Sequence, residues 1–295
     1  MVMTMFLIGL VYVAFVAILI ALHVPVILII VIAGGFLFFQ YFFSDRIALF
    51  SMRAHEVSPE EAPVLHGVID RLCALSDLPK PKVAIADSDI PNAFATGRNQ
   101  KAAVVCVTTG IMRRLDEPEL EAVLAHELSH VAHRDVAVMT IASFLGLLAG
   151  FVVRSSIYAG YLGGGGFGGG RRDDSRDNTG AIILLVLLAS AIVYALSFLL
   201  TRALSRYREL SADRAGAILT GRPSTLASAL VKVSSEIARI PTRDLRAAES
   251  LNAFFFAPAL RQGQVSLASL MATHPPLERR LDQLARIERE MGHAA

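Results

Sequence analysis

The stretch HELSHVAHRD, residues 126–135, places two histidines four positions apart with a glutamate beside the first. Between residues 122 and 132 the only charged side chain is Glu127. A carboxylate without a partner on so apolar a segment is costly, so a positive group is expected close to it. A bound metal ion satisfies that requirement. The alternative is a pair of core histidines beside a buried, paired glutamate.

The residues before this stretch predict the helix that carries it. Asp116 followed by Glu119 has the spacing of a capping box, and the predicted helix runs through His130. On that helix His126 and His130 are one turn apart, so both rings project from one face and can hold a single ion. Glu127 lies about 60° around the helix from His130, near enough to act on a water molecule at that ion.

Zinc held by two histidines needs a third protein ligand and an open position for water. The metzincin pattern HExxHxxGxxH is absent, because His133 stands at the glycine position and Val136 at the third histidine. The next glutamate along the chain is Glu209, in RELSADRAGA, and it is the predicted third ligand. Asp213, one turn later on the same helix face, is expected to orient a liganding imidazole.

The composition predicts a membrane protein. Hydrophobic residues make up 54% of the 295 residues and the mean hydropathy is +0.53, which is too apolar for an ordinary soluble protein. Residues 1–44 contain no Asp, Glu, Lys or Arg, and each half is about 20 residues long, enough to cross a bilayer. We expect an N-terminal transmembrane hairpin. A secretory signal is the alternative, but a basic n-region is missing and a second apolar segment follows.

Two more uncharged segments, residues 136–153 and 181–200, predict a second hairpin and therefore four spans. The alternative is the core of a soluble domain, although such helices normally show a polar stripe. Residues 158–180 between them are rich in glycine and predict a flexible loop. A phosphate-binding loop is excluded, because no GxxxxGK[ST] pattern occurs there.

Two hairpins place the polar stretches 45–135 and 201–295 on one side of the membrane, where they can form the two parts of one domain. Arginines next to these stretches favour a cytoplasmic domain, although arginines of the glycine-rich loop weigh against it. The net charge of +2 predicts no nucleic-acid partner.

The polar stretches predict helices and a small sheet. The periodicity of residues 59–75 indicates an amphipathic helix, and short β-like runs follow at residues 82–86, 93–98 and 102–108. Cys73 lies in the helix and Cys106 in the last run, so both are expected to be small buried residues.

HELSHVAHRD, the apolar hairpin after it, RELSADRAG and THPPLERR at residues 273–280 together resemble the HtpX family of membrane-bound zinc metalloproteases. The resemblance covers nearly the whole chain, including NAFATG and TTGIM, and extends more distantly to the CAAX prenyl proteases. The expected fold is mainly α and multi-pass, with four transmembrane helices and a zincin-like metalloprotease domain of helices and a small β-sheet.

The resemblance implies a zinc metalloendopeptidase with one zinc ion per chain. His126, His130 and Glu209 are the implied zinc ligands, and Glu127 is the implied general base. The family is associated with quality control of misfolded membrane proteins under stress. The resemblance therefore implies that misfolded membrane proteins are the protein partners. The expected location is the inner cell membrane, within the lipid bilayer.

Further predictions concern a substrate-binding strand and two residues near the C-terminus. Asn92, Ala93 and Phe94 are expected in an edge strand that accepts the substrate backbone, with an interior strand as the alternative. His274 and Arg280 are candidates for stabilising an oxyanion or for holding the helix that follows Pro275 and Pro276.

Two alternative functions remain at this stage. A CAAX-type protease would act on prenylated C-termini, but four spans are too few for the large membrane chamber that this resemblance suggests. A non-catalytic membrane adaptor or chaperone would hold zinc structurally, and it would need a fourth protein ligand, for which His133 is the nearby candidate.

Overall fold

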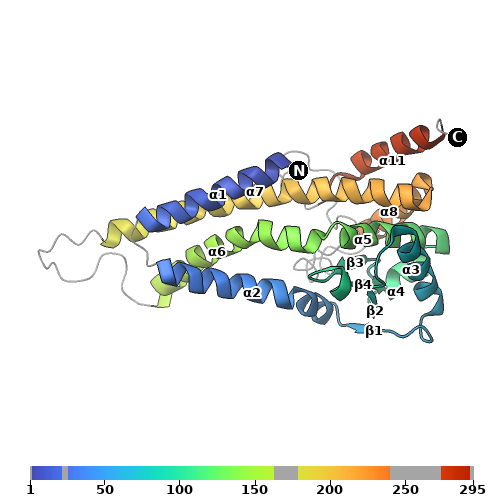
Figure 1. The fold of residues 1–295 in the computed structure, drawn as a ribbon, viewed down its shortest axis with the longest axis horizontal. Helices are drawn as coiled ribbons and strands as arrows, with labels where there is room; N and C mark the ends of the chain where they lie inside the picture. The colour runs from blue at the N-terminus through green and yellow to red at the C-terminus, as the bar shows by residue number, and fades with distance from the viewer. Residues whose placement is uncertain (1, 22–25, 163–178, 240–273, 293–295) are drawn as a thin grey trace, which may run out of the picture. The chain divides into compact units, whose positions relative to one another are not determined.

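The computed structural model describes residues 2–21, 26–162, 179–239 and 274–292 (Figure 1). These described residues are mainly helical and include a small mixed sheet. It divides into two compact units: Met1–Gln40 with Met139–Leu204, and Tyr41–Val138 with Ser205–Ala295. Three helices pass from one unit into the other, so both units are built from segments that are far apart in the sequence.

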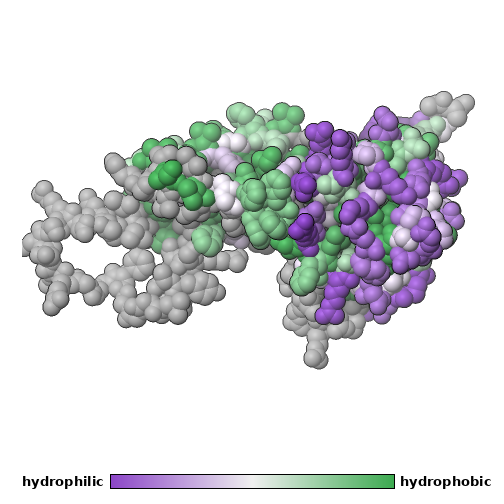
Figure 2. All heavy atoms as spheres, turned by 60° about the horizontal axis from the view of Figure 1, so that its bottom comes forward, coloured by the Kyte–Doolittle hydropathy of each residue, from purple (hydrophilic) through white to green (hydrophobic). Residues whose placement is uncertain are grey.

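The first unit is formed by α1 (Val2–Ala21) and by parts of α2 (Val26–Ser51), α6 (Asp135–Leu162) and α7 (Thr179–Thr220). Its buried cluster joins α1, α6 and α7 and contains Phe15, Phe144, Leu148, Ala149 and Val193. Outside this cluster the described side chains of the unit are largely hydrophobic and exposed, as Figure 2 shows. Such a surface is typical of helices that face lipid.

By length and composition, two helices of the described residues can cross a membrane: Val2–Ala21 and the Leu184–Thr220 part of α7. A third is obtained if α5 and α6, which meet at a bend of 60°, are counted as one span. The prediction of four spans is therefore supported only in part.

The sheet of the second unit has the strand order β1-β2-β4-β3. Its strands are β1 (Ala54–Glu56), β2 (Lys82–Ala86), β3 (Ala93–Thr96) and β4 (Val104–Thr108). The central pair, β2 and β4, is parallel, whereas β1 and β3 pair antiparallel at the two edges. The structure thus places the predicted substrate strand at an edge of the sheet.

Helices cover this sheet on both faces. On one side lie α3 (Pro63–Ser76), α4 (Thr109–Arg114), α5 (Glu117–Ala132), α8 (Pro223–Arg239) and α11 (Leu277–Gly292), which share the main hydrophobic core (Figure 1). On the other side Ala48 near the end of α2 packs with Phe94 and Cys106. Cys73 is buried as well.

The first turn of α5 has the predicted capping box. Asp116 accepts a hydrogen bond from the Glu119 backbone N–H, and the Glu119 carboxylate accepts one from the Asp116 backbone N–H. Both bonds satisfy donors that have no partner within the helix, which fixes where α5 begins. The helix then ends two residues beyond His130, at Ala132.

Several predicted boundaries differ from the structure. The helix predicted at residues 59–75 begins only at Pro63, because Ser58 and Glu61 form a hydrogen-bonded turn before it. The strands predicted at 93–98 and 102–108 are shorter, and the three-residue strand β1 was not predicted.

The glycine-rich loop predicted at residues 158–180 is also shorter than expected. The helix α6 continues to Leu162 and α7 begins at Thr179, so both ends of the predicted loop are helical. Residues 163–178 lie outside the described residues. The sequence YAGYL at 158–162 contains only one helix-weakening glycine, which explains why α6 extends through it.

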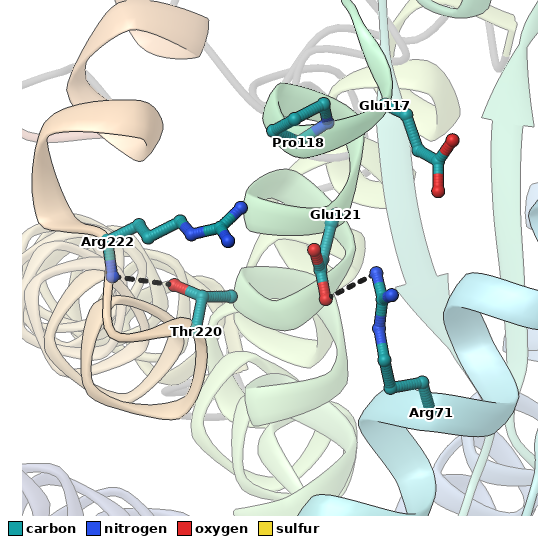
Figure 3. A pocket seen from close by; sticks show the side chains of 6 residues that line it. All are labelled: Arg71, Glu117, Pro118, Glu121, Thr220 and Arg222. Atoms are coloured by element: carbon teal, nitrogen blue, oxygen red, sulfur yellow. Dashed lines mark hydrogen bonds and ion pairs between the residues drawn. The ribbon is translucent and has the colours of Figure 1, made fainter.

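A cavity of about 400 Å³ opens beside the first turns of α5 (Figure 3). Its walls carry Arg71, Glu117, Pro118, Glu121, Thr220 and Arg222. Arg71 and Glu121 form an ion pair of 2.8 Å across it. No predicted metal ligand or catalytic residue lines this cavity, which lies at the opposite end of α5 from His130.

Candidate metal centre

Three side chains that are far apart in the sequence converge between α5 and α7. One nitrogen of His126, one nitrogen of His130 and one carboxylate oxygen of Glu209 all lie within 4.8 Å of one another. Nε2 of His126 is 3.7 Å from Glu209 Oε2, and Nε2 of His130 is 3.5 Å from Glu209 Oε1. All three residues are buried. The predicted zinc ligands are therefore neighbours in space.

The convergence depends on a close approach of the two helices. The helix α7 is continuous from the apolar segment through Glu209 and Asp213 to Thr220. At Gly216 it lies so close to α5 that an added Cβ would be 2.9 Å from the backbone nitrogen of His126. Only glycine fits this contact without a shift, so Gly216 sets the distance between the two helices that carry the ligands.

Behind His126 the structure places an aspartate and an arginine. Nδ1 of His126 lies 2.9 Å from Asp213 Oδ1. Arg280 holds the same carboxylate through two hydrogen bonds, with its Nε and Nη2 atoms 2.7 and 2.6 Å from Asp213. Arg280 is fully buried, and a two-point guanidinium contact of this kind fixes a carboxylate in position.

A second set of the same chemistry lies behind His130. Nδ1 of His130 is 2.6 Å from Asp135 Oδ2, and Nε of Arg208 is 3.0 Å from the same oxygen. Asp135 is the first residue of α6, and Arg208 immediately precedes the predicted ligand Glu209 on α7.

The donor set fits a zinc ion. Because each ring directs Nδ1 toward an aspartate, the Nε2 atoms of both histidines face Glu209. Two imidazole nitrogens and one carboxylate oxygen are ligands that zinc accepts, and three protein ligands leave a position open for catalysis. The carboxylate partners on Nδ1 are typical supports of histidines that bind metal.

Glu127 is buried next to these ligands. Its Oε2 accepts a hydrogen bond of 3.0 Å from the backbone N–H of Ala95 on β3. Burial raises the pKa of Glu127 to about 7, although the nearby His130 acts in the opposite direction. A carboxyl group with such a pKa can both take up and release a proton near neutral pH.

His274, which precedes α11, lies at the same centre. Nδ1 of His274 is 3.0 Å from Glu209 Oε2, and Arg280 Nη1 is 3.9 Å from that oxygen. The other ring nitrogen of His274, Nε2, is buried and has no hydrogen-bond partner among the described residues. A buried ring nitrogen without a partner is available for a bound substrate.

Comparison with known proteins assigns the chain to a family. Residues 59–288 match the sequence profile of peptidase family M48. Protease HtpX homolog 1 of Streptomyces coelicolor is 60% identical over 291 residues, which are 99% of this chain and 92% of that protein. The chain belongs to the HtpX family of M48 peptidases. The Protease HtpX homolog of Moorella thermoacetica, another member, is 56% identical over 292 residues, covering 99% of this chain and 94% of that protein.

The fold has a relative among solved structures. The crystal structure of S. mikatae Ste24p superposes with a TM-score of 0.54 at 20% sequence identity. The match covers 94% of this chain and 62% of that structure's length. At this identity the likeness concerns the fold alone. The HtpX family membership rests on the sequence matches.

The predicted substrate strand lies beside the catalytic candidate. Asn92, Ala93 and Phe94 are all buried, and β3 pairs on one side with β4. The Ala95 N–H points away from β4, toward Glu127. Since backbone groups alternate along a strand, the N–H and C=O of Ala93 also point away from β4.

In this HtpX family member, Asp135, Arg208 and Gly216 were not predicted from the sequence as site residues. Asp135 ends the stretch HELSHVAHRD and precedes an apolar run, which is a usable signal for a buried functional carboxylate. Arg208 has a similar signal, since it adjoins the predicted ligand Glu209. His133 was considered as a ligand, but it lies exposed at the end of α5, outside the converging group.

Proposed function

We propose that this protein is a zinc-dependent endopeptidase of the cell membrane that cleaves misfolded membrane proteins on the cytoplasmic side. The protein belongs to the HtpX family, whose M48 peptidase profile implies a metallopeptidase. The observation that carries the proposal is the position of Glu127, buried beside three converging metal-ligand candidates. His126, His130 and Glu209 would hold the ion. When bound, zinc polarises a peptide carbonyl and lowers the pKa of water toward about 7.

Each nearby side chain has a role in this proposal. Glu127 takes the proton from the attacking water and passes it to the nitrogen of the leaving amine. Because the Ala95 N–H engages Oε2, the oxygen assigned to this proton transfer is Oε1. When the His274 ring carries both protons, Nδ1–H donates to Glu209 and Nε2–H donates to the negative charge that develops on the carbonyl oxygen. The edge of β3 that points away from β4 pairs with the substrate backbone as an added strand.

Membrane quality control is supported by the site's connection to the apolar helices. The ligand Glu209 lies on the same continuous helix as the apolar segment at residues 184–200. The histidine-bearing α5 is followed after a two-residue break by α6. Substrates that are themselves anchored in the membrane would reach such a site, and the family resemblance points to unfolded ones.

A cleavage assay with controlled metal content tests the function. The protein is purified in detergent with a chelator, zinc is added back, and cleavage of an unfolded membrane protein is followed for wild type and Glu127→Gln. We expect about one zinc per chain in both proteins. The rate should fall by at least about 10²-fold in the variant, since proton transfer is lost.

Two results would contradict the proposal. Equal cleavage by Glu127→Gln would remove Glu127 from the chemistry. Binding of zinc without cleavage of several unfolded substrates by wild type would favour the non-catalytic adaptor. A surface variant such as Asp70→Asn, in an exposed ion pair with Lys80, serves as the matched control and should cleave as wild type does.

A further inference from the structure

Each of the two candidate zinc histidines is backed by an aspartate and an arginine. His126 contacts Asp213, and Arg280 contacts the same aspartate. His130 contacts Asp135, and Arg208 contacts that aspartate. The first set comes from α5, α7 and α11. The second set comes from α5, from the first residue of α6 and from α7. Each of the two ligands therefore has an aspartate and an arginine of its own.

The contact between Asp135 and His130 requires a broken helix. In a straight α-helix two residues five positions apart point about 140° away from each other, so their side chains do not meet. Here α5 ends at Ala132 and α6 starts at Asp135, with a bend of 60°. The break brings the Asp135 carboxylate to 2.6 Å from Nδ1 of His130.

The backbone at this break adopts an unfavourable conformation. Arg134 has a φ of 54°, in the left-handed region that side chains other than glycine and asparagine rarely occupy. Such conformations persist where surrounding contacts fix them, and they concentrate at functional sites. The contact that this conformation makes possible is the one between Asp135 and His130.

Burial explains why an arginine is needed as well. Asp135 is 6% exposed, and a buried carboxylate without a positive partner is strongly disfavoured. Arg208 supplies the charge from α7, one residue before Glu209. The same turn of α7 thus carries the candidate ligand Glu209 and also Arg208, which contacts the aspartate behind His130.

We infer that Asp135 and Arg208 form a positioning pair that orients His130 for metal binding and ties this ligand to the start of α6 and to the Glu209 turn of α7. The inference rests on the proposed function, because it assumes that His130 is a ligand. Asp135 accepts the Nδ1–H of His130, which fixes the ring tautomer and directs the Nε2 lone pair toward the metal. Neither residue contacts the substrate in this assignment.

The test measures metal affinity rather than activity. Purified full-length wild type, Asp135→Ala, Asp135→Asn, Arg208→Ala and Arg208→Lys are titrated with zinc against a competing chelator. Loss of a carboxylate behind a liganding histidine typically weakens metal binding about 10–100-fold. We expect this loss for Asp135→Ala and for Arg208→Ala. Asp135→Asn and Arg208→Lys should retain part of the affinity, because the amide still accepts a hydrogen bond and the lysine keeps the charge.

A spectroscopic measurement separates positioning from general destabilisation. Each protein is loaded with Co²⁺, whose visible absorption depends on the arrangement of its ligands. The bands should shift in Asp135→Ala and remain unchanged in the exposed control Asp70→Ala. If Asp135→Ala does not fold, Asp135→Asn and Arg208→Lys supply the comparison, and thermal unfolding of the metal-free proteins shows which variants are intact.

Three outcomes would overturn the inference. Wild-type affinity and an unchanged cobalt spectrum in both Asp135 variants would show that Asp135 only begins α6. An effect of Asp135→Ala without any effect of Arg208→Ala would break the pair. If the wild type binds no stoichiometric metal, both the positioning role and the proposed function are rejected. If the wild type binds metal and the variants bind it equally well, the positioning role alone is rejected.

Discussion

His274 contributes one nitrogen to Glu209 and keeps the other buried without a partner among the described residues. If Nε2 stabilises the oxyanion, His274→Gln should reduce kcat by about 10²–10³-fold, which is the usual effect of removing one such donor. KM and zinc content should change little. Steady-state kinetics together with metal analysis of the purified variant measure both effects.

The same variant distinguishes a structural role of His274. A histidine that only holds Glu209 would, when replaced, lower zinc affinity and the unfolding temperature while the metal-saturated enzyme kept its kcat. A preserved kcat at saturating zinc would therefore contradict the oxyanion role.

At single positions the sequence predicted the ligands better than their supports. The spacing of HExxH is local to one helix, so it places His126 and His130 on one face before any tertiary structure is known. Asp213 was predicted because it lies one turn from Glu209. Asp135 was not, because on an unbroken helix it would point away from His130, and the break cannot be deduced from helix periodicity.

At the scale of elements, Gly216 controls how closely α7 approaches α5. An alanine Cβ there would lie 2.9 Å from the His126 backbone nitrogen, so one helix must move. We expect Gly216→Ala to destabilise the protein by about 1–3 kcal/mol, as overpacked contacts do. It should also weaken zinc binding, since Glu209 moves with α7. Chemical unfolding and chelator competition measure the two effects.

Gly67 provides the matched control for this substitution. It also lies in a helix, but an added Cβ would contact nothing within 4 Å. Gly67→Ala should therefore leave zinc binding unchanged and stabilise α3 by about 0.5–1 kcal/mol. A wild-type zinc affinity in Gly216→Ala would contradict the role assigned to the close approach.

The start of α5 predicts a dependence of stability on pH. Burial alone would raise the pKa of Glu119, but hydrogen bonds from Lys232 and Ser228 outweigh it and hold this pKa below its ordinary value. The stabilisation is therefore present above the ordinary pKa of 4.5 and is lost as the pH falls through the lower, folded-state value.

Glu119→Gln isolates this charge, because glutamine can still complete the capping box with Asp116. The variant should be less stable than wild type at pH 7, and the difference should shrink on acidification below about pH 4.5. Unfolding temperatures measured across this pH range give the result. A difference that stays constant with pH would show that the ion pair with Lys232 does not contribute.

The elements of the second unit were predicted where local patterns decide them. The capping box at Asp116 predicted where α5 begins, and β2 was predicted with its observed bounds, Lys82–Ala86. The strand β1 was missed because three residues, AHE, carry no periodicity, and its extended form depends on pairing with β2. Such dependence on a partner strand is general for short edge strands.

At the scale of the whole molecule, the proposed four-span topology places both polar parts of the chain on one side of the membrane. Cys73 and Cys106 are buried, so introduced surface cysteines can be labelled selectively. In sealed vesicles of known orientation, Ala74→Cys and Ser235→Cys should react with an impermeant thiol reagent from the cytoplasmic side. Ser175→Cys, between the third and fourth predicted spans, should react from the other side.

Labelling of Ala74→Cys and Ser235→Cys from opposite sides would exclude two complete hairpins. Labelling of both from the non-cytoplasmic side would keep the hairpins and reverse the orientation. The first result would also conflict with a metal site shared by α5 and α7, because Ala74 belongs to the part that contains α5 and Ser235 follows α7 in the other.

The most direct test of the central claim is X-ray absorption at the zinc edge for the zinc-loaded wild type and Glu209→Ala. The proposed ligands predict only nitrogen and oxygen neighbours at about 2.0–2.2 Å, including two imidazoles, and the loss of one oxygen neighbour in the variant. A sulfur neighbour at about 2.3 Å, or an identical spectrum in Glu209→Ala, would contradict a zinc site formed by His126, His130 and Glu209.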